Sequence, residues 1–456
     1  MKQLRRILAL LLSMLMLLAL CACGSRAEDD DDDGGSSRRR RREAASDSAD
    51  PKDSEAGIPG GWLPGFGKER GRSKPASAPA EQPASAPAEW PAEAPAEEPA
   101  EEPAEQAAAE ASWMRVAMIC DYGDIDDQSY NQAAYEACAA YCDANSVPLT
   151  YYKPGADSDA ERIAMIENAI EEGYNVIVLP GYLFGNAIGE TAPRYPDVKF
   201  IALDVSEFDI TEFSGLDAIP DNVCAVTYSE EQAGFMAGYA AVMMGYHRLG
   251  FLGGMAVPAV MRYGCGFVQG ADAAAIELGD YDVWINYAYG NQFYGDADIT
   301  DAMKRWYGQG VDAVFACGGG IYTSAAEAAA YYGGKVIGMD MDQAPVIDAW
   351  YGEDMTITSA VKAFTPTVRF LLDEIEADRF DRYAGEIRLG VGSPDPEESF
   401  VQLGASTLFN SGFTRDDYAL LVERLYSGYY LVSNDVTCGP ETFATAIAVK
   451  DYGDLK

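Results

Sequence analysis

The chain has 456 residues, with 73 acidic and 33 basic side chains and a formal net charge of -40. A surface this acidic repels phosphate, so the charge argues against a nucleic-acid-binding protein. The length leaves room for about two folded domains, because the first quarter of the chain has no periodic apolar pattern.

Residues 1–22 have the pattern of an export signal, with a basic start and an apolar run over residues 7–20. The sequence Cys21-Ala22-Cys23-Gly24 follows, and it resembles a bacterial lipobox with a small residue before the modified cysteine. On this resemblance Cys23 is acylated and becomes the mature N-terminus. The alternative is an uncleaved anchor helix, but the run is short for a span of about 20 residues. We therefore expect an exported protein, lipid-anchored to the cell membrane on its extracytoplasmic face.

Residues 23–112 have the composition of a linker. They contain an acidic run at 28–33, a basic run at 38–42 and a Pro-Ala-Glu tract from 75 to 111. Opposite charge blocks and proline-rich repeats cannot bury a core, so no fold is expected here. The basic run is interpreted as a solvated charge block rather than a lipid contact.

From residue 113 onward, apolar runs alternate with stretches of helical spacing, which predicts parallel sheets with helices on both faces. Ten expected strands exceed one sheet, so we predict an α/β protein with two doubly wound lobes. The expected boundaries are about 113–245 plus 360–456 for the first lobe and about 246–359 for the second, with a first crossing at 245–249. The expected strands are 116–120, 147–152, 176–180, 200–205, 223–228, 249–253, 283–287, 313–316, 336–338 and 356–361.

The loop after the first expected strand is unusually polar. It runs from Asp121 to Asn131 and combines four carboxylates, two tyrosines and two amides. In open α/β sheets ligands sit outside the carboxyl ends of the strands, so this loop is predicted to form half of a ligand cleft. A calcium loop is disfavoured, because Asp126 stands where an EF-hand needs glycine and Gln132 where it needs glutamate.

Other candidate side chains also follow expected strands. Asp204, Asp340 and Lys362 come directly after apolar runs, Gly318-Gly319-Gly320 precedes a helix, and Phe293 lies in a Gly/Asn-containing loop. Their common position predicts one cleft between the two lobes. The alternative is that the acids cap helices and the glycines make a tight turn, since no phosphate-binding GxxxxGK[ST] motif is present.

No catalytic set is apparent in the sequence. His247 is the single histidine, no Gly-x-Ser-x-Gly motif occurs, and no catalytic base is apparent in the sequence around Cys120. Cys138 and Cys142 lie four apart on an expected helix, but no further ligand pair complements them, so packing is favoured over a metal site. Of the nine cysteines, seven lie outside the leader, an odd number that implies no disulfide framework. We expect a binding protein without enzymatic activity, cofactor or metal.

The segment from Asp121 to Gln132 resembles the D-x-G-x-[IF]-[DN]-D-x-[SG]-[FY]-N-Q opening of the basic membrane protein (PnrA-like) family. The segments 178–184, 250–255 and 336–343 also match this family, and the resemblance covers about residues 116–364. These proteins are substrate-binding lipoproteins of ABC importers. The resemblance implies a type I periplasmic-binding fold, with permease and ATPase subunits as partners.

Characterised members of that family bind purine nucleosides. The resemblance implies that Asn131 and Asp204 hydrogen-bond the base while Phe293 stacks on it. Tyr122 or Tyr130 is expected to supply a second ring.

The resemblance further implies that Gly319, Asp340 and Lys362 hold the ribose. Other functions stay open. The protein could be a sensory ectodomain, or a binding protein for a sugar or other small polar ligand. A secreted enzyme acting on nucleosides or sugars is a further alternative, against which the missing nucleophile and base argue. The complete set of expected ligand-binding residues is Asp121, Tyr122, Asn131, Asp204, Phe293, Gly319, Asp340 and Lys362.

Overall fold

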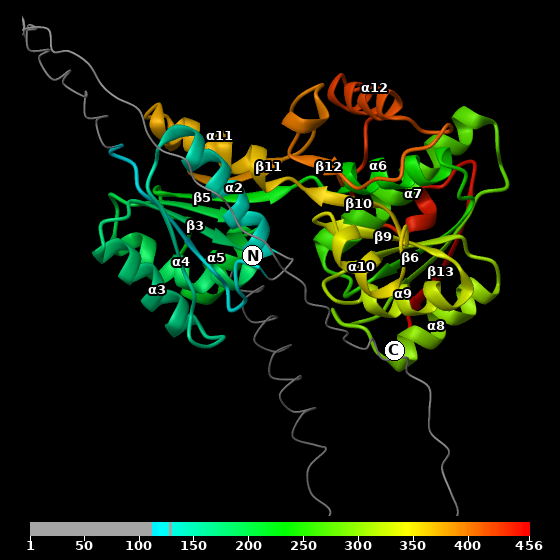
Figure 1. Ribbon diagram of the computed structural model, residues 1–456, viewed down its shortest axis with the longest axis horizontal. Helices are drawn as coiled ribbons and strands as arrows, with labels where there is room; N and C mark the ends of the chain where they lie inside the picture. The colour runs from blue at the N-terminus through cyan, green and yellow to red at the C-terminus, as the bar shows by residue number, and fades with distance from the viewer. Residues whose placement is uncertain (1–111, 127–129) are drawn as a thin grey trace, which may run out of the picture. The chain divides into compact units, whose positions relative to one another are not determined.

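The computed structural model describes residues 112–126 and 130–456 (Figure 1). The expected export signal, the acylation site Cys23 and the linker up to residue 111 lie outside the described residues, as do residues 127–129 of the polar loop. Within the described part, no helix combines the length and the apolarity that crossing a membrane requires.

The first sheet has six strands in the order β11-β5-β4-β3-β1-β2, and every neighbouring pair is parallel. Its inner strands are almost entirely buried apolar runs, as parallel strands covered by helices on both faces require. The strands are β1 (Val116–Ile119), β2 (Leu149–Tyr152), β3 (Val176–Pro180), β4 (Lys199–Leu203), β5 (Val223–Tyr228) and β11 (Gly385–Leu389). The helices of this lobe are α2 (Tyr130–Asn145), α3 (Asp159–Glu171), α4 (Gly185–Thr191), α5 (Glu207–Ser214) and α11 (Phe364–Glu376).

The second sheet has seven strands in the order β12-β10-β9-β8-β6-β7-β13. Only β12 runs antiparallel to its neighbour in this described sheet. The strands are β6 (Arg248–Gly253), β7 (Trp284–Tyr289), β8 (Ala313–Cys317), β9 (Lys335–Asp340), β10 (Thr356–Lys362), β12 (Val401–Leu403) and β13 (Ala448–Asp454). The helices are α6 (Glu230–Met243), α7 (Pro258–Leu278), α8 (Ala297–Gly308), α9 (Tyr322–Tyr332), α10 (Ala344–Tyr351) and α12 (Arg415–Tyr426).

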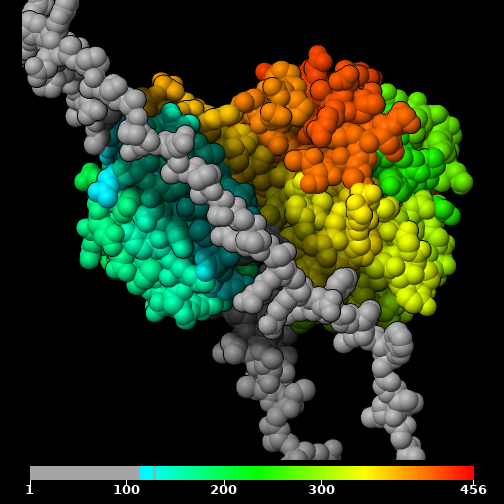
Figure 2. All heavy atoms as spheres, viewed as in Figure 1, coloured from blue at the N-terminus to red at the C-terminus, as the bar shows by residue number. Residues whose placement is uncertain are grey.

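The chain passes between the sheets at three places: after β5, after β10 and after β11. Helix α6 packs along α7 of the second lobe, whereas α11 packs along α2 of the first. The first crossing therefore lies near residue 229, and the predicted crossing at 245–249 was wrong. The segment 401–456 was also assigned to the wrong lobe, because β12 and β13 join the second sheet. In Figure 2 the dark orange residues of the C-terminal part accordingly lie on the lobe of the second sheet.

Glycines on both α6 and α7 explain why α6 follows the second lobe. A Cβ at Gly266 would lie 2.0 Å from the carbonyl oxygen of Glu231, and one at Gly234 would lie 2.1 Å from that of Tyr263. Only residues without a side chain allow two helix backbones to approach so closely. This contact brings the first turn of α6 and the middle of α7 together, close to the carboxyl end of β10.

Candidate functional site

The side chain of Lys362, the last residue of β10, lies among three carboxylates. Its Nζ is 2.8 Å from Asp204 Oδ2, 3.2 Å from Asp340 Oδ1 and 3.7 Å from Glu230 Oε1. The lysine side chain is only 3% exposed. Asp204 belongs to the first lobe and Asp340 to the second, so the ammonium group joins the carboxyl ends of both sheets. We refer to Lys362, Asp204, Asp340 and Glu230 as the Lys362 cluster.

The two aspartates occupy corresponding places in the two lobes. Asp204 follows β4 and Asp340 ends β9, and these strands hold the same position in their sheets. Both residues have left-handed backbone conformations, with φ of 58° and 63°. Aspartate tolerates this region better than most residues, although it costs about 1–2 kcal/mol. Such strained positions concentrate at functional sites, where the surrounding structure compensates for them.

Each aspartate also accepts a hydrogen bond from a tyrosine of its own lobe. The hydroxyl of Tyr130 donates to Asp204 Oδ2 over 2.8 Å, and the hydroxyl of Tyr263 donates to Asp340 Oδ1 over 3.1 Å. Tyr130 begins the helix after β1, and Tyr263 lies on the helix after β6. Burial and the neighbouring carboxylates raise the pKa of both phenols well above 10, so both remain neutral donors.

The charges of the cluster make it rich in hydrogen-bond acceptors. Burial alone would lower the pKa of Lys362, but Asp204 and Asp340 raise it well above its usual value, so the ammonium group stays charged. The pKa of Asp340 is raised, chiefly by burial, against the opposing effect of Lys362. Arg262 Nε donates to Glu230 Oε2 over 2.7 Å, which leaves three carboxylates facing two cations. Such a site suits ligand hydroxyl and N–H groups and disfavours phosphate.

The polar loop after β1 is shaped by its own hydrogen bonds. Asn131 Nδ2 donates to Asp121 Oδ1 over 2.7 Å, and the backbone N–H of Asp121 donates back to Asn131 Oδ1 over 3.0 Å. Arg162, buried in α3, donates from Nε to the carbonyl oxygen of Asp121. Asn131 is buried, whereas the Tyr122 side chain is exposed. These contacts hold Asp121 and Asn131 together and connect the start of the loop to α3.

Phe293 and Gly319 lie together at the carboxyl end of the second sheet. The carbonyl oxygen of Phe293 accepts a 2.8 Å hydrogen bond from the N–H of Gly320. A Cβ at Gly319 would lie 2.9 Å from that same oxygen, and Gly319 has a φ of 52°. The close approach explains the glycines without a phosphate site. Among the described residues, no hydrogen bond or ion pair joins the Phe293 loop or the Gly318–Gly320 turn to the Lys362 cluster.

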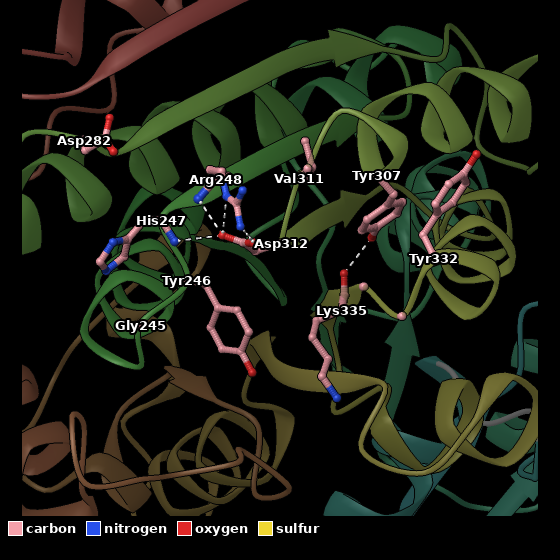
Figure 3. A pocket seen from close by; sticks show the side chains of 13 residues that line it. Gly245, Tyr246, His247, Arg248, Asp282, Tyr307, Val311, Asp312, Tyr332 and Lys335 are labelled. Atoms are coloured by element: carbon pink, nitrogen blue, oxygen red, sulfur yellow. Dashed lines mark hydrogen bonds and ion pairs between the residues drawn. The ribbon is translucent and has the colours of Figure 1, made fainter.

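A hollow of about 950 Å³ lies beside the Lys362 cluster and is lined from both lobes. Its walls include Asp126 and Gln132 from the first lobe, Asp342 from the second, and Lys362 and Phe364 at the second crossing. A second hollow, of about 630 Å³, lies where β6, β8 and β9 begin, at the opposite edge of the second sheet (Figure 3). There the polar groups pair with one another, as in the 2.7 Å contact between Arg248 and Asp312. The first hollow is therefore favoured as the candidate ligand site. Lys362 borders it, whereas Asp204, Asp340, Phe293 and Gly319 are not among its lining residues.

Sequence reasoning missed Tyr263, Glu230 and Arg262, and considered Tyr130 only as a stacking ring. Glu230 has a recognisable signal, because it is an acidic residue at the start of a mostly apolar helix, and the structure buries it. Arg262 has none, since its pairing with Glu230 depends on the packing of α6 against α7. In the described part of the chain, no group of three or more His, Cys, Asp or Glu side chains could hold a metal, and Cys138 and Cys142 are buried.

The model of the family of PnrA-like ABC transporter substrate-binding proteins (Bmp) matches residues 114–393. The chain belongs to this family. The match ends before β12, so the part of this PnrA-like protein from residue 394 onward lies beyond the family match.

Individual relatives agree with this assignment. The ABC transporter nucleoside-binding protein BmpA of Lactococcus lactis is 25% identical over 287 residues, which is 59% of this chain and 76% of that protein. Basic membrane protein B of Borreliella burgdorferi is 27% identical over 255 residues, or 55% of this chain and 70% of that protein.

Solved structures show the same fold. An ABC transporter solute-binding protein from Conexibacter woesei has a TM-score of 0.55 at 24% identity, over 70% of this chain and 99% of that one. A solute-binding protein of an ABC transporter from Aeropyrum pernix has a TM-score of 0.51 at 20% identity, over 71% of this chain and 94% of that one. The predicted α/β fold of the type I periplasmic-binding class, with two doubly wound lobes, is thus confirmed.

Proposed function

We propose that this PnrA-like protein captures a purine nucleoside beside the Lys362 cluster and delivers it to the permease and ATPase of an ABC importer. The observation that carries the proposal is the position of Lys362 between Asp204 and Asp340, at the carboxyl ends of both sheets. Membership of a substrate-binding family supports the delivery role, and the nucleoside-binding relative supports the ligand class.

The chemistry of the cluster fits the parts of a nucleoside. A ribose diol donates hydrogen bonds to Asp340, and the Lys362 ammonium group donates to ribose oxygens. Asp204 accepts from an N–H group of the base, while Phe293 stacks on the ring. A nucleotide is disfavoured, because its phosphate would approach three carboxylates. Asp121, Asn131 and Gly319 shape the loops around the ligand, and Tyr122 covers it from the rim.

Ligand capture requires the lobes to close, and the three crossings provide the hinge. In the closed form, groups from both lobes contact the ligand at once, and the importer recognises that form. Acylation of Cys23 would keep the protein at the extracytoplasmic face of the membrane, next to the importer. The linker would then separate the binding domain from the lipid surface.

Isothermal calorimetry tests the ligand assignment. The full chain carrying Cys23→Ala is unfolded, refolded to remove any retained ligand, and titrated with adenosine, guanosine, inosine, cytidine, ribose, inosine monophosphate and an amino-acid mixture. We expect tight binding of a purine nucleoside and little heat from ribose or the nucleotide. Binding of ribose or an amino acid, with no response to nucleosides, would overturn the proposed ligand and the roles of Asp204 and Phe293.

A further inference from the structure

The C-terminal strand lies beside the loop that carries Phe293. Strand β13, which lies beyond the family match, pairs in parallel with β7 at the edge of the second sheet, from Ala448 opposite Trp284 to Asp454 opposite Tyr289. Because the two strands run in the same direction, both end at the carboxyl edge of the sheet. There β7 continues into residues 290–296, which include Phe293.

The residues after β13 contact both ends of this loop. The backbone N–H of Leu455 donates to the carbonyl oxygen of Tyr289 over 2.8 Å, immediately before the loop. Lys456 Nζ forms an ion pair with the carboxylate of Asp296, the last loop residue, and lies 4.0 Å from Asp298. The side chains of Lys456 and Asp296 are 30% and 26% exposed, so solvent screens this pair only in part.

Asp296 is the point at which the loop is fixed to its surroundings. Its Oδ1 accepts a 3.0 Å hydrogen bond from the N–H of Ile299 and caps α8, while its Oδ2 accepts from Gln292 Nε2 over 2.9 Å. Its own N–H donates to Ser324 Oγ over 3.0 Å. Lys456 therefore binds the carboxylate of a residue that already connects the loop to α8 through its side chain and to α9 through its backbone N–H.

The ring of Phe293 has little space in which to adjust. A Cβ added at Gly254 would lie 2.5 Å from the ring, and one at Gly318 would lie 3.0 Å from it. A small displacement of the loop therefore moves Phe293 relative to the ends of β6 and β8.

We propose that β13 and Lys456 form a positioning element of the ligand cleft, which fixes residues 290–296 and with them the ring of Phe293. This inference rests on the proposed function in one respect, because it gives the positioned ring a role in stacking on the nucleoside. It adds to that function a specificity-determining part that lies beyond the family match.

Hydrogen–deuterium exchange on the ligand-free full chain tests the positioning directly. Lys456→Ala removes the ion pair, and Lys450→Ala on the same strand is the matched control, because Lys450 is exposed and lies over Tyr452. We expect exchange of the amides in 290–296 to be at least about threefold faster in Lys456→Ala than in wild type, and unchanged in Lys450→Ala. Equal exchange in the two variants would overturn the proposal.

Calorimetry with inosine then tests the link to the ligand. We expect Lys456→Ala to bind about two- to fivefold more weakly, as loss of a partly exposed ion pair predicts, and Lys456→Arg to restore affinity. In a double-mutant cycle, Asp296→Asn keeps the helix cap, and Lys456→Ala should have little further effect in that background. Faster exchange together with unchanged inosine affinity would overturn the role in ligand binding. If wild type binds no nucleoside but exchange still differs between the variants, the proposed ligand fails and the positioning of the loop stands.

Discussion

Replacing Lys362 with methionine tests the central electrostatic argument. The substitution keeps an unbranched apolar side chain but removes the charge that faces Asp204 at 2.8 Å, Asp340 at 3.2 Å and Glu230 at 3.7 Å. With Arg262 as the remaining cation, the three carboxylates then carry an excess of two negative charges instead of one.

The size of the effect follows from burial. Removing one partner of a buried ion pair costs about 3–5 kcal/mol, because the other charge stays buried without compensation. The side chains of Asp204 and Asp340 are 21% and 17% exposed, so water stabilises them in part. We therefore expect a loss near the lower end of that range, about 3 kcal/mol in the free energy of unfolding at pH 7.5.

Urea unfolding followed by circular dichroism provides the assay, with Lys304→Met as the control. Lys304 Nζ lies 3.0 Å from Glu327 on the surface, and its loss should leave the unfolding midpoint close to that of wild type. A loss below about 1 kcal/mol for Lys362→Met would contradict the view that the lysine compensates buried carboxylates.

The pH dependence gives a second, independent check. Burial raises the pKa of Asp340 above its ordinary value, and the negative charge of Asp204 adds to this rise. The positive charge of Lys362 opposes it. Without Lys362 this pKa rises further, so the native variant takes up a proton that the unfolded chain does not bind until lower pH. Its stability therefore increases as the pH falls through the native pKa of Asp340 towards the lower pKa of the unfolded chain. The difference between wild type and variant should narrow at pH 5.5, and a difference that does not change with pH would refute this explanation.

Three further predictions concern other parts of the chain. Asp340→Asn should weaken nucleoside binding at least tenfold in calorimetry while leaving the fold intact, and unchanged affinity would remove Asp340 from the site. Asp340→Ala should in addition lower the free energy of unfolding by about 1 kcal/mol, because residue 340 has a φ of 63°. Gly266→Ala should destabilise the protein by about 1–3 kcal/mol in urea unfolding, because its Cβ would lie 2.0 Å from Glu231 O, and a wild-type midpoint would show that α6 and α7 can separate freely. Iodoacetamide at pH 8 should label Cys438 first among the described cysteines, because the others are buried. Burial raises the pKa of Cys224, for example, to about 12. Mass spectrometry that finds Cys224 labelled as fast as Cys438 would contradict this prediction.

The alternation of strands and helices is a local property, and the sequence predicts it well. Each of the ten expected strands is present, and 176–180 and 223–228 have the predicted bounds. Their apolar runs are short and end at polar residues, so neighbouring residues alone specify them. Strands β11 and β13 could not be found in this way, because they carry many exposed side chains and are strands only through their pairing with β5 and β7.

The sequence by itself determined that Asp204, Asp340 and Lys362 follow apolar strands, and the rules of parallel sheets then predict that they lie at carboxyl ends. Only the tertiary structure decided which charges meet. Lys362 and Asp204 are 158 residues apart, and their contact depends on the sheet that each strand joins and on the crossing near residue 229. The same dependence hid the Glu230–Arg262 pair and the contact of Lys456 with Asp296. The local periodicity of a sequence carries no information about such pairings, because they form only when distant segments pack together.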